Sequence, residues 1–268
     1  MPEGPEVKKV VDFLRANCLN KSIVQVKILS GRYTKKPIEN LFNRSWCPPI
    51  KIKDVDCKGK FIYFSLQNDV YLFNTLGMTG TWSKSNSKHA RVEFVLDDES
   101  SVYFTDMRNF GTLKFVLSKL ELTKKLKSIG PDFLRDGFDP NEFYKLLHKN
   151  GHKTIAQVLM DQKVVSGIGN YLKAECLYAA KISPHRFCCH INEKESNNLF
   201  HACKRIIRLS YEMGGATLST YRQPNGEKGL YSRRFAVYNQ KQDPDGYDVI
   251  KEKTLDKRTT HWVPNIQK

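Results

Sequence analysis

Apolar residues recur at helical spacing near the start of the chain. In "VKKVVDFLRANC" (7–18), positions 7, 10, 11, 14 and 18 are apolar or cysteine, and charged residues stand between them. A period of three to four residues with a charged opposite face is typical of an amphipathic α-helix. The sequence therefore predicts a helix that follows the opening six residues, "MPEGPE".

The period then changes from helical to alternating. Seven short runs carry this pattern: "SIVQVKIL", "IKIKDVD", "KFIYFSL", "VYLFNTLG", "ARVEFVLD", "SVYFTDM" and "GTLKFVLS". Turn formers such as "QND" and "DDES" separate the runs, which favours antiparallel hairpins in a sandwich or barrel. We predict a first domain, residues 1–125, with one N-terminal helix on an antiparallel β-sandwich.

Helical spacing returns in the second half of the chain. The Gly, Pro and Asp residues of "SIGPDFLRDGFDP" indicate a linker, which we place at residues 126–140. The helical stretches after it are "NEFYKLLHKN", "IAQVLMDQKV", "NYLKAECLYAAK" and "NNLFHACKRIIRLSYEM". We predict a helical second domain (141–234), which ends in a Gly-rich loop (214–234), and then a terminal hairpin (235–268). The fold class is α+β.

Composition narrows the range of partners. The 268 residues include 44 Lys+Arg and 28 Asp+Glu, a net charge of +16. Such an excess of positive charge indicates a polyanionic partner, and nucleic acid is favoured over a membrane surface. No apolar run reaches the length of a membrane span, and no secretory signal is present. We expect an intracellular protein that is neither secreted nor bound to a membrane.

The cysteines do not indicate a disulfide framework. Seven is an odd number, the spacing is irregular, and free thiols are expected in a reducing compartment. A zinc site is one interpretation of "PHRFCCH" and the "HAC" after it, but the C-x2-C spacing is missing, so packing and surface positions are favoured. We predict no metal and no cofactor. The residues of this cluster are His185, Cys188, Cys189, His190, His201 and Cys203.

The segment "VVSGIGN" joins two predicted helices. Gly167 and Gly169 allow a tight turn and the close approach of a ligand. Asn170 then begins the second helix, where backbone N–H groups and the helix dipole attract a phosphate. An ordinary capped helix junction is the alternative interpretation.

Five motifs in chain order resemble the formamidopyrimidine-DNA glycosylase and endonuclease VIII family. They are "MPEGPE", "LGMTG", "DMRNFG", "VVSGIGN" followed by "AECLYAAKISPH", and the terminal "KRTTHWVPNIQK". The resemblance implies a bifunctional DNA glycosylase and abasic-site lyase of base-excision repair, with a helix-two-turn-helix second domain. The implied partner is damaged double-stranded DNA, with abasic-site and single-stranded DNA as further substrates. A monomer is expected, located in the nucleus if the source is eukaryotic.

The resemblance assigns the chemistry to the first six residues. Pro2 becomes the nucleophile once Met1 is removed, and its amine forms an iminium with the sugar. With an α-amino pKa of about 7.7 to 8.0, roughly a quarter to two-fifths of such an amine is neutral at about pH 7.5. Glu3 is implied to move protons, and Glu6 to hold the opened sugar or the flipped base. A disordered tail is the alternative for so short a segment.

Three residues match the family's phosphate contacts. Lys60 in "CKGKFIYF" is counted with the catalytic residues and also contacts phosphate in this assignment, and Asn170 and Arg258 complete the set. Arg258 is expected to be the best anchor, because a guanidinium binds phosphate in a bidentate fork. Thr75 stands where some bacterial members carry a phosphate-binding histidine.

A base that leaves the stack creates a void in the duplex. Met78 of "LGMTG", with Arg108 and Phe110 of "DMRNFG", matches the family's void-filling residues. Without the resemblance, a Met and a Phe near strand ends would be assigned to the core.

The terminal hairpin departs from the bacterial pattern. Asp245, Asp248, Val263 and Ile266 stand where many relatives carry the four cysteines of a zinc finger, and His261 is alone. Zinc therefore lacks a four-ligand site in this segment. We predict a zinc-less finger, as in endonuclease VIII-like 1 and its plant relatives.

Three alternatives stay open. The zinc-less tail favours oxidised pyrimidines and formamidopyrimidines as substrates, whereas the length of "STYRQPNGEKGLYSRR" resembles the branch that recognises 8-oxoguanine. A non-catalytic DNA-binding protein with the same helix pair is a second alternative. A general polyanion or RNA binder is the third.

Overall fold

The computed structural model describes residues 1–41, 47–218 and 221–268. They form two compact units, each with a core of its own. Unit 1 comprises Met1–Pro2, Glu6–Ser128 and Gly214–Gly229, and unit 2 comprises Glu3–Pro5, Ile129–Met213 and Leu230–Lys268. The boundary thus passes twice through the first six residues.

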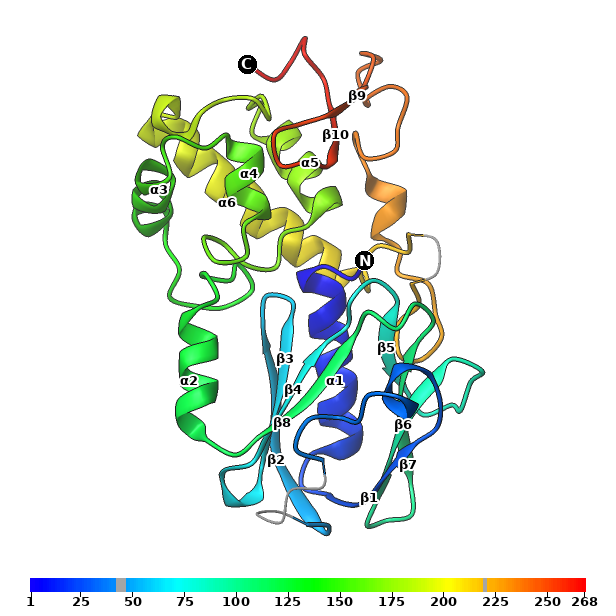
Figure 1. The fold of residues 1–268 in the computed structure, drawn as a ribbon. Coiled ribbons are helices and arrows are strands. Elements are labelled where there is room, and N and C mark those ends of the chain that lie inside the picture. The colour runs from blue at the N-terminus through cyan, green and yellow to red at the C-terminus, as the bar shows by residue number, and fades with distance from the viewer. Residues whose placement is uncertain (42–46, 219–220) are drawn as a thin grey trace. The chain divides into compact units, whose positions relative to one another are not determined.

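An eight-stranded antiparallel sheet builds unit 1, in the order β5-β7-β6-β1-β2-β3-β4-β8 (Figure 1). Its strands alternate buried and half-exposed positions, as a sheet with one face on a core requires. The bounds are β1 (Ser22–Ile28), β2 (Ile50–Lys58), β3 (Phe61–Leu66), β4 (Tyr71–Thr75), β5 (Gly80–Ser83), β6 (Ala90–Leu96), β7 (Ser101–Asp106) and β8 (Thr112–Val116). Helices α1 (Gly4–Cys18) and α2 (Lys119–Lys127) accompany the sheet.

The two halves of this sheet face each other across one core. β1 and β2 pair over only two residues, so the sheet divides there into four-stranded layers. Phe64 of one layer lies 5.7 Å from Trp82 of the other, measured between ring centroids. Val10 and Leu14 of α1 are fully buried in the same core. The predicted sandwich with one N-terminal helix is confirmed.

Helices dominate unit 2. They are α3 (Pro140–Lys149), α4 (Ile155–Met160), α5 (Asn170–Ala179) and α6 (Glu193–Glu212), and a two-stranded sheet of β9 (Ile250–Lys253) and β10 (Thr259–Trp262) follows. Phe133, Phe143 and Phe200 pack in the core with their rings at steep angles to one another, and their ring centroids lie 5.4 to 6.0 Å apart. Figure 1 shows β10 beside α5, and contacts between the two elements fix this arrangement. The predicted α+β class is therefore confirmed.

Some elements differ from the predicted pattern. α1 begins at Gly4 rather than residue 7, because the fixed φ of Pro5 suits the first helical turn. α4 ends at Met160, where Asp161 adopts an extended conformation. Neither α2 nor β5 was predicted, because α2 buries only Leu122 and β5 has only four residues.

The Gly-rich loop requires a correction. We predicted residues 214–234 as part of the second domain, but Gly214–Gly229 belongs to unit 1. The reason is local: the Ala216 N–H donates to the Glu6 carboxylate of α1 at 2.7 Å. Residues 219–220 of this loop lie outside the described residues. Within the described ranges, no helix is both long and apolar enough to cross a membrane.

Candidate catalytic and DNA-binding site

The carboxylate of Glu3 caps the N-terminus of α5. Its Oε2 accepts hydrogen bonds from the N–H groups of Gly169 at 2.6 Å and Leu172 at 3.3 Å. Its Oε1 accepts from the Tyr171 N–H at 3.1 Å. The positive end of the helix dipole stabilises a carboxylate at this position. Glu3 is 3% exposed, so these contacts fix its side chain.

The turn before α5 leaves no room for larger residues. A Cβ on Gly169 would lie 2.2 Å from the Glu3 carboxyl carbon. The Gly4 N–H donates to the Gly167 carbonyl at 2.8 Å, which ties the start of the chain to the same turn. We predicted a phosphate at these N–H groups, and this is wrong for the groups that Glu3 occupies. Because the carboxylate comes from residue 3, no local pattern near residue 170 could indicate it.

Pro2 precedes Glu3 directly and is buried, and its nitrogen is in the peptide bond with Met1. Glu6 lies one turn further along α1, is 1% exposed and accepts the Ala216 N–H. A Cβ on Gly215 would approach the Glu6 Oε1 to 2.6 Å, and the backbone there has a positive φ of 83°. Glycine is therefore required where this loop meets Glu6.

Two loops of unit 1 carry the predicted void-filling residues. Met78 is 40% exposed and Phe110 is 53% exposed, so neither belongs to the core. The Arg108 guanidinium lies 4.8 Å above the Phe110 ring. At Gly77, which has a φ of 60°, a Cβ would lie 2.6 Å from the Phe110 backbone, so the two loops pack directly against each other. The structure thus brings these three residues together at the ends of neighbouring loops.

Asp106 organises both loops, and our sequence analysis missed it. Its Oδ1 accepts from Thr79 Oγ1 at 2.5 Å and from the Arg108 N–H at 3.2 Å. Its Oδ2 accepts from the Gly111 N–H at 2.6 Å. An aspartate at the end of a strand, followed by a short loop with Asn and Gly, is the signal that could have indicated it.

Lys60 lies in the tight turn between β2 and β3, after Gly59 with a φ of 57°. Its side chain is half-buried. Thr75 ends β4, and its hydroxyl lies 2.7 Å from the Thr112 hydroxyl on β8. Both positions belong to unit 1.

Asn170 and Arg258 both belong to unit 2. Asn170 begins α5 and contacts the terminal hairpin at the residue that follows Arg258. The Asn170 side chain donates from Nδ2 to the Thr259 carbonyl at 2.8 Å, while its Oδ1 is buried without a partner among the described residues. Arg258 is exposed and ends the turn between β9 and β10. We call residues 254–258 the finger turn. Thus the structure places Asn170 beside the strand that follows Arg258.

One side of α5 holds the terminal segment. Glu175 accepts from the N–H groups of Ala236, Val237 and Tyr238 at 2.8 to 3.0 Å. Burial raises the pKa of Glu175, and these three N–H groups oppose that shift. Further along the helix, Tyr178 donates its hydroxyl to Asp243 at 3.1 Å.

The side chains at the four positions where many relatives carry zinc-binding cysteines do not converge on one point. Val263 is fully buried against Ala174 and Val237, and Ile266 packs on the same cluster. Asp245 and Asp248 instead participate in local turn contacts. In the part of the chain that the structure describes, no group of three His, Cys, Asp or Glu side chains is arranged to hold a metal ion.

His261 lies in the interior of the terminal hairpin. It is 5% exposed, and its ring packs 4.9 Å from the Tyr238 ring. Burial, together with the charges of Lys251 and Lys173, lowers the pKa of His261 to about 4. Nδ1 is buried without a described partner. The neighbouring Trp262 is partly exposed.

Comparison with known proteins covers the whole chain. Family models described as the formamidopyrimidine-DNA glycosylase N-terminal domain, H2TH domain and C-terminal domain match residues 1–113, 129–222 and 232–268. The chain is 32% identical to the formamidopyrimidine-DNA glycosylase of Mycoplasma genitalium over 276 residues, which cover 100% of this chain and 96% of the relative. The chain belongs to the formamidopyrimidine-DNA glycosylase family. It is accordingly an enzyme of the DNA glycosylase class.

Solved structures of the family share its fold. The crystal structure of MutM (Fpg) from Thermus thermophilus superposes with a TM-score of 0.87 at 31% identity, over 99% of this chain and 98% of that chain. The Lactococcus lactis Fpg in complex with abasic-site DNA superposes with a TM-score of 0.86 at 26% identity, over 99% of each chain. The family is thus shown by both sequence and fold.

Proposed function

We propose that this glycosylase is bifunctional: it removes an oxidised base and then cleaves the strand through an iminium on Pro2. The observation that carries the proposal is Glu3, adjacent to Pro2 in the chain and fixed by three backbone N–H groups. A carboxylate with this support keeps one position through several proton transfers, which general acid–base catalysis requires. Related Fpg structures contain abasic-site DNA and Fapy-dG DNA, which supports damaged duplex DNA as the partner.

The proposed reaction begins with removal of Met1, which frees the Pro2 amine. The nitrogen lone pair attacks the sugar C1′, and the bond from C1′ to the base breaks with its electron pair leaving on the base. The Glu3 carboxylate takes up the proton that the attacking Pro2 nitrogen releases and donates it to the ring oxygen as the bond from C1′ to that oxygen breaks, which leaves an iminium between C1′ and Pro2. Loss of a C2′ proton then expels the 3′ phosphate by β-elimination, and δ-elimination expels the 5′ phosphate. Hydrolysis finally releases Pro2.

The other predicted residues bind the DNA in this proposal. Lys60, Asn170 and Arg258 contact phosphates, and Arg258 is an exposed cation, as this role requires. Met78, Arg108 and Phe110 fill the void that the flipped base leaves, and their exposure supports this role. Glu6 contacts the sugar or base in this proposal, and the loop after Gly214 lies beside it.

The finer assignment is to the zinc-less branch with a preference for oxidised pyrimidines and formamidopyrimidines. The buried Val263 supports the zinc-less assignment, because this apolar side chain stands at a position where many relatives carry a zinc-binding cysteine. A Lactococcus lactis Fpg structure contains DNA with an oxidised pyrimidine, which supports such a base as a substrate. Excision from single-lesion duplexes, with 8-oxoguanine as the competing base, tests the preference. A higher rate on 8-oxoguanine would overturn it.

Borohydride trapping on abasic-site duplex DNA tests the nucleophile. The mature protein should form a stable covalent complex, because borohydride reduces the iminium. Pro2→Gly should lose most of it, and so should a protein in which a tag retains Met1. Pro37→Gly is the matched control and should trap normally, because Pro37 is exposed and lies outside every helix and strand of unit 1. Full trapping with Met1 retained would refute the role of Pro2, and no trapping by any variant would favour a non-catalytic DNA-binding protein.

A further inference from the structure

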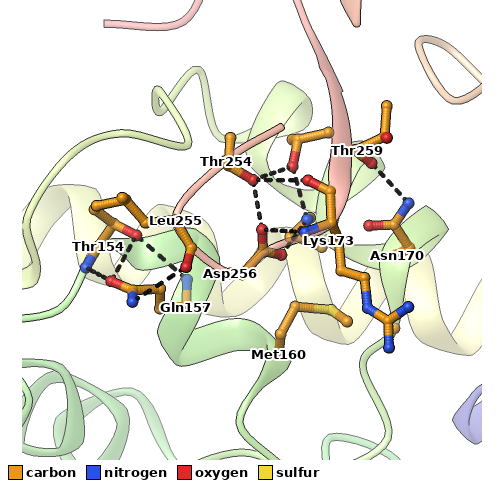
Figure 2. A network of polar contacts seen from close by, with 12 residues as sticks. Thr154, Gln157, Met160, Asn170, Lys173, Thr254, Leu255, Asp256 and Thr259 are labelled. Atoms are coloured by element: carbon orange, nitrogen blue, oxygen red, sulfur yellow. Dashed lines mark hydrogen bonds and ion pairs between the residues drawn. The ribbon is translucent and has the colours of Figure 1, made fainter. Parts of the chain in front are cut away.

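A buried ion pair joins α5 to the finger turn. Lys173 Nζ lies 2.5 Å from Asp256 Oδ2, and the exposed fractions of the two side chains are 0% and 2%. The same ammonium donates to Thr260 Oγ1 at 2.7 Å. Figure 2 shows Lys173 reaching from the helix to Asp256 of the turn. Neither charge contacts solvent, so the pair cannot bind a ligand itself.

The second carboxylate oxygen of Asp256 fixes the turn internally. Asp256 Oδ1 accepts from Thr254 Oγ1 at 2.5 Å and from the backbone N–H of Arg258 at 3.2 Å. Thr254 also accepts the Lys257 N–H through its carbonyl at 2.9 Å, and Lys257 has a positive φ of 63°. One carboxylate thus connects the helix lysine to the backbone of Arg258.

Stability alone does not account for this arrangement. Apolar residues of similar volume are often as stabilising as a buried ion pair, because the pair loses its hydration. The apolar cluster around Val263 already attaches the terminal segment to α5. However, a two-stranded sheet with four-residue strands is marginally stable by itself, so its turn needs support to keep one conformation.

We propose that Lys173 and Asp256 form a positioning pair that holds the Arg258 backbone in place for phosphate binding. Asn170 precedes Lys173 by one helical turn and bonds the Thr259 carbonyl, so both predicted phosphate contacts of unit 2 share one support. The inference rests on the phosphate-binding role proposed above for Arg258. Its ligand class is the phosphodiester backbone of duplex DNA.

Duplex binding of a set of variants tests the pair. Fluorescence anisotropy with an undamaged duplex gives Kd and its salt slope, and thermal unfolding reports stability. Arg258→Ala should weaken binding about tenfold and lower the slope by about one unit. Asp256→Asn should cause a similar loss. The variant that combines Asp256→Asn with Arg258→Ala should bind no more weakly than Arg258→Ala alone, because both changes remove the same contact between Arg258 and phosphate. Glu212→Gln removes an exposed ion pair of α6 and is the matched control. It should change neither Kd nor the salt slope.

A second variant separates positioning from stability. Lys173→Met combined with Asp256→Leu replaces the pair by apolar side chains and should keep the unfolding temperature. It should nevertheless bind as weakly as Arg258→Ala, because the Arg258 N–H loses its acceptor. Normal binding by this stable apolar variant would overturn the proposal. Additive losses of binding when Asp256→Asn is combined with Arg258→Ala would overturn it too. Unchanged binding in Arg258→Ala would overturn it as well, while borohydride trapping at saturating DNA reports the Pro2 chemistry separately.

Discussion

Glu3 joins the first residues of the chain to a helix that begins 167 residues later. Its carboxylate replaces a side-chain cap on α5, because the N-cap residue is Gly169 and has no side chain. The acid proposed for catalysis is therefore also a structural anion at a helix N-terminus. A change at this position alters both the chemistry and the helix.

Glu3→Gln separates these two effects. We expect base excision to be lost, because the amide cannot donate the proton, while some cleavage of a pre-formed abasic site remains. Removal of the charge from the helix N-terminus should lower the free energy of unfolding by about 1 kcal/mol. Single-turnover excision, abasic-site cleavage and chemical denaturation measure the three quantities.

Asp139→Asn is the control for the helix effect, because Asp139 caps α3 in the same unit with its carboxylate. It should lose some stability but no excision. If Glu3→Gln reduces both cleavage activities equally, or neither, the proton-transfer role of Glu3 is wrong.

His261 should make unit 2 less stable in acid. Its folded-state pKa is lowered to about 4, below an unfolded value near 6.5, so the unfolded chain binds the proton more readily. This contribution to stability is fully present above pH 6.5 and is lost as the pH falls from 6.5 to about 4. The full loss of stability is on the order of 3 kcal/mol.

Denaturant unfolding at several pH values tests this prediction. His261→Phe keeps a ring against Tyr238 but cannot titrate, so its stability should depend less on pH over this window. His201→Gln, at an exposed position of α6, should follow the original pH dependence. Identical profiles for the original protein and His261→Phe would contradict the buried neutral histidine.

At the scale of elements, the loops after β4 and β7 form one structure. Asp106 bonds residues of both loops, and Gly77 allows their backbones to touch. This arrangement presents Met78 and Phe110 as exposed apolar side chains. Exposed apolar groups on a rigid support suit insertion into a base stack.

The double variant Arg108→Ala with Phe110→Ala should lose far more excision on duplex DNA than on single strands. Only a duplex leaves an unpaired partner base and a void to fill. Parallel single-turnover assays on the same lesion in both contexts give the ratio. Leu120→Ala is a suitable control, because Leu120 is an exposed apolar residue of α2. Equal losses on both substrates would indicate a folding defect instead.

Elements with a clear period could be predicted from the sequence, and elements held by distant contacts could not. Strands β2 to β4 alternate cleanly, and α6 carries a long amphipathic pattern. By contrast, α2 has a single buried apolar residue, and the loop at Gly214–Gly229 depends on Glu6 for its place in unit 1. In the site, motifs indicated Met78 and Arg108, but Asp106 and the Lys173–Asp256 pair act only through tertiary contacts. Such contacts leave no local period.

At the scale of the whole molecule, the net charge of +16 attracts the phosphate backbone of any duplex. Lysines and arginines that neutralise phosphates release counterions, and this contribution does not depend on a damaged base. Lesion selectivity in our proposal comes instead from uncharged or buried groups such as Glu6, Met78 and Phe110. Affinity and selectivity should therefore respond differently to salt.

Binding to a lesion duplex and to its undamaged counterpart should weaken in parallel as salt rises from about 50 mM to about 200 mM. The two plots of log K against log salt should share one slope, so the ratio of the two affinities stays constant. Anisotropy titrations with a non-cleavable abasic analogue measure both lines without turnover. Arg258→Ala should lower both slopes by about one unit and leave the ratio unchanged, because a phosphate contact carries no information about the base. A ratio that falls with salt would mean that lesion selectivity depends on additional contacts between cations and phosphates, and the phosphate role of Arg258 would be abandoned if only the lesion slope changed.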